Sequence, residues 1–155
     1  MKTNLTLFLV FIFIGSVISQ ENEKITTQTF AYKTGDPHNL DEFDEWPENL
    51  DAVVAAPENH KILMENEKVR VLEVTLLPGK IEEVHHHRWP SVLYIQEAGD
   101  FIDYDGDGDI IMDSREIKPA LKFPMTMWKE AEGPHSVENL SKTITIRLIR
   151  VEMKN

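Results

Sequence analysis

Apolar and polar side chains alternate along two stretches in the second half of the chain. Residues 72–76 and 144–148 both carry an apolar side chain at every second position. Because successive side chains of a β-strand point to opposite faces, this alternation predicts two half-buried strands. Three further short runs, residues 91–96, 100–104 and 125–129, are rich in β-forming residues, and no helical period stands out beside them. Short strands at this spacing predict an all-β domain, built as an antiparallel sandwich or a small barrel.

The chain begins with a segment of a different kind. Lys2 precedes an almost unbroken apolar run at residues 5–18, and Ser19 supplies a small side chain where a signal peptidase would cleave. As a helix this run rises only about 21 Å, which is short of the roughly 30 Å hydrocarbon core of a bilayer. We therefore expect residues 1–19 to be a signal peptide. Cleavage would release a secreted or periplasmic protein with no membrane attachment.

Residues 20–52 form an acidic N-terminal arm. They contain nine acidic residues against two lysines, and such an excess of like charge favours an extended chain. The arm also carries large apolar side chains, so we expect it to lie over the domain or over a second copy of it. The apolar residues are Phe30, Tyr32, Leu40, Phe43, Trp46 and Leu50. The remaining residues, 53–155, are expected to form one domain.

Composition narrows the classes of function. A chain of 155 residues with 41% hydrophobic and 28% charged residues is typical of one compact domain. The formal net charge is −11 and the chain has no basic cluster, which argues against a nucleic-acid partner. The absence of cysteine excludes disulfides and thiolate ligands, so a bound metal would need histidine and carboxylate ligands.

Three consecutive histidines carry the main chemical signal. On a strand, His85 and His87 would point to one face and His86 to the other, and two imidazoles on one face can bind one ion. His135 lies 50 residues after His85 and could return on a facing strand as a third ligand. The same spacing also fits a surface cluster of protonatable histidines on an acidic protein.

The histidine segment resembles the first motif of the cupin superfamily. That motif has a Gly, five residues, His-x-His, three or four residues, a Glu, six residues and a second Gly. Gly79, His85, His87 and Gly99 match this spacing. Val92 stands where the metal-binding Glu of the family sits. The resemblance therefore implies a metal site that lacks this carboxylate ligand.

A second part of the chain resembles the end of the second cupin motif. His135 and Asn139 fit its spacing, whereas Glu130 and Glu132 stand where the family has Pro and Gly. The resemblance covers residues 53–153 and is closest to small single-domain cupins of the RmlC-like type. It implies a jelly-roll barrel, also called a double-stranded β-helix, with a divalent metal inside.

The resemblance implies a three-histidine site at His85, His87 and His135, similar to that of thiol and diketone dioxygenases. The ion would be Fe, Mn, Zn or Ni, with open positions for water, substrate or oxygen. We expect an exported small-molecule metalloenzyme, dioxygenase-like or isomerase-like, that forms a homodimer. The alternative is a non-catalytic barrel that binds a small ligand without metal or has a structural role.

A run of alternating aspartates is a second candidate site. Asp103, Asp105, Asp107 and Asp109 reproduce the first half of a calcium-binding loop. Ser114 replaces the bidentate Glu of such a loop, and two Asp-Gly pairs are also what a hairpin turn requires. We expect a hairpin turn, with weak calcium binding as the alternative.

Val92 and Tyr94 are candidate pocket residues. The strand period places both on one face, opposite Leu93, and they would line the barrel if that face points inward. His38 and His60 are isolated in the sequence. We interpret both as solvent-facing or local hydrogen-bonding residues.

Overall fold

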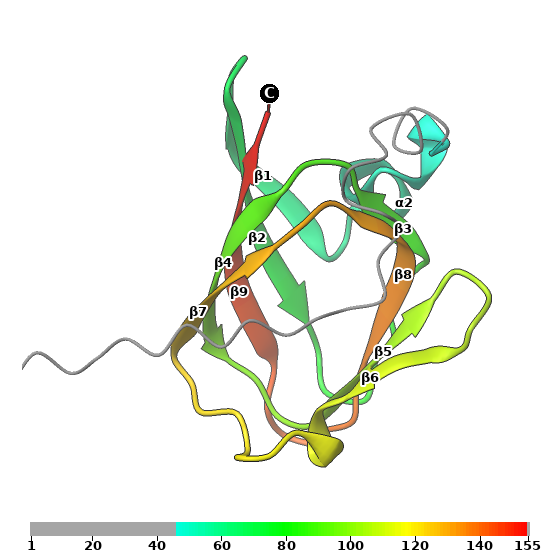
Figure 1. Cartoon of the computed structure of the whole chain (residues 1–155), viewed down its shortest axis with the longest axis vertical. Coiled ribbons are helices and arrows are strands. Elements are labelled where there is room, and N and C mark those ends of the chain that lie inside the picture. The colour runs from blue at the N-terminus through cyan, green and yellow to red at the C-terminus, as the bar shows by residue number, and fades with distance from the viewer. Residues whose placement is uncertain (1–45, 155) are drawn as a thin grey trace, which may run out of the picture.

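The structure is a computed structural model, and it describes residues 46–154 (Figure 1). These residues form two antiparallel sheets and three short helical segments. The strands are β1 (His60–Glu65), β2 (Val69–Leu76), β3 (His85–His87), β4 (Ser91–Glu97), β5 (Phe101–Asp105), β6 (Ile110–Asp113), β7 (Met125–Lys129), β8 (Glu132–Asn139) and β9 (Ile146–Met153). The helical segments are η1 (Glu48–Leu50), α2 (Ala52–Ala55) and η2 (Ser114–Glu116). The expected signal peptide and residues 20–45 of the expected arm lie outside the described residues.

The two sheets face each other across the interior of a barrel (Figure 1). One has the strand order β1-β2-β9-β4-β7, and the other has the order β3-β8-β5-β6. All strand pairs within them are antiparallel. The prediction of an all-β, jelly-roll architecture is confirmed.

Alternation along β2 fixes which of its side chains enter the barrel. Leu72, Val74 and Leu76 are buried, whereas Glu73 is exposed between them. The strand ends at Leu76, and the Pro78–Gly79 turn follows, in which Gly79 has a φ of 67°, a left-handed conformation that favours glycine. The apolar row of β2 therefore forms one wall of the interior, as the sequence pattern predicts.

The described end of the acidic arm lies against β3. Asp51 begins α2 by accepting a hydrogen bond from the backbone N–H of Val53, and it forms an isolated parallel bridge with His86. The ring of Trp46 lies 5.4 Å from the ring of His86. Within residues 46–154, no helix is long and apolar enough to cross a membrane.

Candidate metal centre

Three buried histidines meet inside the barrel. His85 and His87 project from β3, and His60 comes from the first position of β1. The ligand atoms of these three side chains all lie within 4.8 Å of one another. The geometry is that of a site positioned to hold one metal ion through three imidazoles.

The structure keeps His86 apart from this group, as the strand period predicts. Its Nε2 lies 2.9 Å from the backbone oxygen of Pro47, on the side of the arm. His86 is not among the residues that line the cavity. It is a buried contact between β3 and the N-terminal segment.

His60 is the candidate ligand that the sequence analysis missed. The chain reaches it through β1, which pairs with β2 so that His60 faces Val74, an inward-pointing residue. The solvent-facing alternative for His60 was wrong because the side chain is buried, whereas the local hydrogen-bonding alternative is confirmed by the contact of its Nδ1, 3.2 Å from the backbone oxygen of Ala56. An isolated histidine gives no spacing signal, and only the β1–β2 register reveals its direction.

His135 stands beside the group as a fourth histidine. It lies on β8, directly opposite His85 in the β3–β8 register. Its ring centroid lies 4.6 Å from that of His85 and 5.7 Å from that of His87. The structure thus brings together the three histidines expected from sequence, but the tightest group contains His60 in the place of His135.

The four histidine rings are all oriented by a contact between Nδ1 and a protein oxygen. In every case Nδ1 faces a protein oxygen, which leaves Nε2 for another partner. The four contacts are His60 to the Ala56 carbonyl (3.2 Å), His85 to the Glu83 carbonyl (2.8 Å), His87 to Glu152 Oε1 (2.7 Å) and His135 to the Gly133 carbonyl (2.9 Å). An imidazole that donates its Nδ1–H to a carbonyl or carboxylate is fixed in the tautomer that offers Nε2 to a metal. The donor set therefore fits a transition-metal ion.

Burial keeps the three clustered rings neutral. It lowers the pKa of His60 from 6.5 to about 4, and the charge of Arg150 contributes to the same effect. Burial likewise lowers the pKa values of His85 and His87 well below 6.5, and the neighbouring histidines reinforce the shift. Neutral imidazole is the form that binds metal, so the rings are ready for an ion at neutral pH.

A network of charged side chains is linked to the histidine cluster through His87. Glu152 contacts His87 through Oε1 and pairs with Nε of Arg70 through Oε2. Arg70 in turn reaches Asp51, with 2.9 Å between Nη1 and Oδ1. This network joins the start of α2 to a candidate metal ligand.

A second charged group lies beside the histidines. Glu132 pairs with Lys129, and its Oε2 lies 2.7 Å from Nη1 of Arg150. Burial alone would raise the pKa of Glu132, but the two cations outweigh it and hold that pKa far below its usual range. Glu132 is thus an ionised carboxylate whose charge is offset within the protein.

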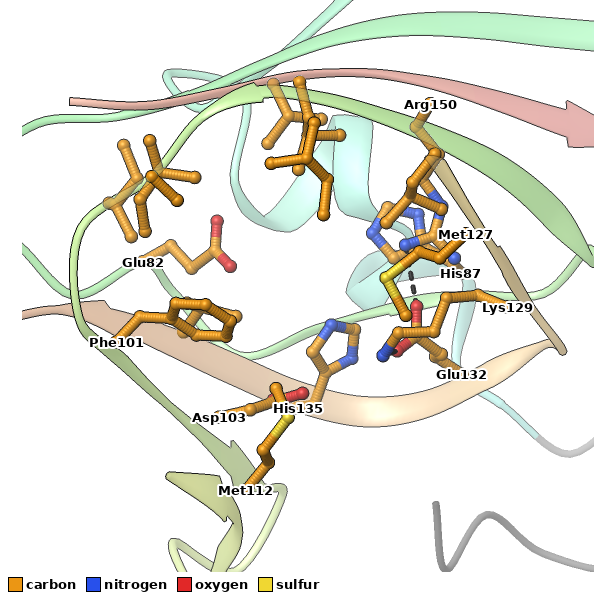
Figure 2. A pocket seen from close by; sticks show the side chains of 18 of the residues that line it. Glu82, His87, Phe101, Asp103, Met112, Met127, Lys129, Glu132, His135 and Arg150 are labelled. Atoms are coloured by element: carbon orange, nitrogen blue, oxygen red, sulfur yellow. Dashed lines mark hydrogen bonds and ion pairs between the residues drawn. The ribbon is translucent and has the colours of Figure 1, made fainter. Parts of the chain in front are cut away.

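The histidines line one cavity with a volume of about 110 Å³. Figure 2 shows Phe101 and Glu82 at one end and His87, Lys129 and Arg150 at the other. Much of the remaining wall is apolar. Its apolar side chains include Val74, Leu76, Leu93, Ile95, Ile146 and Leu148.

Two further acidic side chains enter this cavity. Burial, reinforced by the charge of Asp103, raises the pKa of Glu82 from 4.5 to about 8. Burial also raises the pKa of Asp103. Oε1 of Glu82 lies 4.0 Å from Nε2 of His85, so this carboxyl group is close to the candidate ligands.

Val92 and Tyr94 do not line the pocket, because the condition set for them, that their face of β4 points inward, is not met. Leu93 and Ile95 line it instead, and Tyr94 is 44% exposed on the outer face. The cause is that β4 carries apolar residues on both faces, so its pattern does not show which face points inward. The position of the missing motif carboxylate, at Val92, therefore points away from the metal centre.

The aspartate run does not assemble into a calcium loop. Asp103 is buried in the cavity wall, whereas Oδ1 of Asp105 accepts hydrogen bonds from the backbone N–H groups of Asp107 and Asp109 in the turn between β5 and β6. Among residues 46–154, the four aspartates form no group with oxygens close enough to share one ion. The expectation of a hairpin turn agrees with this geometry.

Comparisons with known proteins identify the fold. No family model matches the chain, and neither does any curated protein. A cupin domain from Bordetella pertussis Tohama I is similar over 62% of this chain and 92% of its own, with 21% identity and a TM-score of 0.50. An RmlC-like cupin with a double-stranded β-helix fold from Methanocaldococcus jannaschii covers 61% of this chain and 77% of its own, with 14% identity and a TM-score of 0.45.

Another similar structure is the polyketide cyclase RemF from Streptomyces resistomycificus. It covers 65% of this chain and 68% of its own, with 17% identity and a TM-score of 0.44. Taken with the strand topology, the likeness to the Bordetella domain establishes the cupin fold, a double-stranded β-helix. At these identities the comparison concerns the fold, and function has to be argued from the site.

Proposed function

We propose that this protein holds one divalent transition-metal ion on His60, His85 and His87 and acts on a small molecule bound beside it. The observation that carries the proposal is the convergence of three buried imidazoles whose Nδ1 atoms are all held by protein oxygens. This arrangement requires burial and orientation that a surface cluster of histidines would not have. His60 here replaces His135 in the ligand set expected from sequence.

The nitrogen donors suit Fe, Mn, Ni or Zn. When bound, such an ion would act as a Lewis acid that polarises an oxygen atom of the small molecule. The protein contributes the rest. Glu152 orients His87, and Leu76, Ile95 and other apolar side chains give the cavity an apolar wall against which the small molecule can pack. The class of reaction we propose is oxidation by dioxygen or isomerisation of a small organic molecule.

Metal analysis of the untagged protein tests this function. We expect about one transition-metal ion per chain after purification, because the three neutral rings are oriented before the ion arrives. A chain that stays free of metal after incubation with each of the four candidate ions would contradict the proposal. The cavity would then be that of a metal-free binding module.

We further propose that the protein is exported, on the sequence of residues 1–19 alone. Protein recovered from its native host should begin at or within a residue or two of Gln20. An intact mass that retains residues 1–19 would favour a membrane-anchored form instead.

We also propose that two copies pair through the edge of the five-stranded sheet. Within the described chain, β1 ends this sheet, and three of its apolar side chains, Ile62, Leu63 and Met64, are exposed. An exposed apolar edge strand is a template for pairing with a second chain. Light scattering that gives the mass of a monomer at micromolar concentration would contradict this proposal.

A further inference from the structure

Two carboxyl groups in the cavity lack a partner for one of their oxygens. Within residues 46–154, Oε2 of Glu82 and Oδ1 of Asp103 are buried and accept no hydrogen bond. Both side chains are more than nine-tenths buried and line the cavity. Figure 2 shows the carboxyl end of Glu82 turned toward the cavity interior.

The other acids of the cavity region are already paired with cations. Glu132 has Lys129 and Arg150, and Glu152 has Arg70. Glu82 instead faces the neutral ring of His85 at 4.0 Å. In the described part of the chain, neither Glu82 nor Asp103 has an ion pair with Lys or Arg at 4.0 Å or closer.

Buried acceptors without donors cost free energy, and native proteins contain few of them. A ligand that brings a donor to these oxygens would remove that cost. A ligand with a negative charge offers these oxygens no donor, so it would leave them without a partner. The free oxygens of Glu82 and Asp103 therefore select for a donor and against an anion at their end of the cavity.

We propose that Glu82 and Asp103 form an acceptor subsite that binds the hydroxyl or protonated amine of a small, otherwise apolar molecule. This names the ligand class of the function proposed above and rests on that function, since the donor group would lie beside the metal-binding histidines. The cavity of about 110 Å³ is somewhat smaller than the roughly 150 Å³ that accommodates benzene in a protein core. The ligand is therefore a molecule of few heavy atoms, with its apolar part against residues such as Phe101.

Arg150 defines the competing hypothesis. Its Nη2 is also buried without a hydrogen-bond partner in the described residues, and it would suit an anion. However, its Nη1 is already engaged by Glu132, and Figure 2 shows Arg150 at the opposite end of the cavity from Glu82. A carboxylate that binds best would place the ligand at Arg150 and overturn the acceptor subsite.

Four matched probes test the proposal by NMR titration to tens of millimolar. They are butan-1-ol, butylamine, methyl propyl ether, which has no donor, and butyrate, which is an anion. We expect butan-1-ol or butylamine to bind at least about tenfold more tightly than the ether or butyrate, because only these two supply the missing donor. Whichever of butan-1-ol and butylamine binds more tightly shows whether the ligand's donor group is a hydroxyl or a protonated amine. Equal binding of all four probes, or no binding of either donor, would overturn the proposal.

Variants locate the subsite and separate it from the metal site. Glu82→Gln and Asp103→Asn should each weaken, at least about tenfold, the donor probe that the wild-type protein binds more tightly, whereas the control Glu130→Gln, outside the cavity, should not. Unchanged binding in both cavity variants would overturn the subsite. The titrations are run on metal-loaded and metal-stripped protein. If the protein binds no metal but still prefers the donor probes, the acceptor subsite is supported and the proposed metal function is refuted. If the protein binds metal but does not prefer the donor probes, the metal function is supported and the acceptor subsite is refuted.

Discussion

Nδ1 of His87 lies 2.7 Å from Oε1 of Glu152, so a buried carboxylate orients one of the three clustered rings. Glu152 is itself held by Arg70, which pairs with Asp51 at the start of α2. A carboxylate that accepts the Nδ1–H of a ligating histidine fixes the ring and increases the basicity of Nε2. The affinity of the site for metal should therefore depend on a residue that does not touch the ion.

Glu152→Gln should weaken metal binding by about 10- to 100-fold, because an amide neither orients nor polarises His87 as a carboxylate does. The measurement is a competition titration against a chromophoric chelator. Glu97→Gln is the matched control, since Glu97 pairs with Arg147 on the surface. Circular dichroism establishes that both variants are folded. Equal affinities in the two variants would show that Glu152 has no role in the site.

The metal-free protein should lose stability as the pH falls from about 6.5 to about 4. In this range the unfolded chain protonates His60, while burial keeps the folded side chain neutral with a pKa of about 4. The unfolded state then binds more protons, so the free energy of unfolding rises with pH. Urea unfolding in the presence of a chelator measures this slope. His60→Gln should reduce it, and an unchanged slope would mean that His60 is protonated in the folded protein.

Glu82 should have the opposite effect on stability. Its pKa is about 8 in the folded protein against an ordinary 4.5, so between these values the folded state binds more protons and stability falls as the pH rises. Glu82→Gln should therefore stabilise the metal-free protein at pH about 8, by a few kcal/mol at most, and should have little effect below pH about 4.5. A variant that is less stable than wild type at pH about 8 would contradict this account of Glu82.

Val92→Glu should leave metal affinity unchanged. The cupin pattern has a metal-binding Glu at this position, but β4 presents Leu93 and Ile95 to the cavity and turns Val92 away from it. A carboxylate placed at residue 92 therefore cannot reach the ion without reversing the strand. Tighter metal binding by Val92→Glu would mean that β4 has the other face inward.

Much of the fold can be predicted from the sequence alone, because the alternation of apolar and polar residues along β2 and β9 reflects burial of one strand face. It also places His85 and His87 together, since their spacing fixes a common face. It cannot place His60, whose direction depends on the β1–β2 register. It also fails at β4, where apolar residues on both faces leave the inward face undetermined.

Glu152 was not predicted from the sequence for a related reason. It reaches the site from a segment remote from its partner His87, from which it is separated by 65 positions. No local period records such a meeting. A buried carboxylate near the end of a chain otherwise reads as an ordinary surface residue, and only the packing of β9 against β2 and β4 shows that it is enclosed.

The most direct test of the central claim is the metal content of single-histidine variants, measured by mass spectrometry on untagged protein. His60→Ala, His85→Ala and His87→Ala should each lose most of the bound metal, because every one removes a ligand from a set of three. His86→Gln should retain it, since that ring faces Pro47, and His135→Ala should retain most of it. Full metal content in His60→Ala, together with loss in His135→Ala, would contradict the site described above.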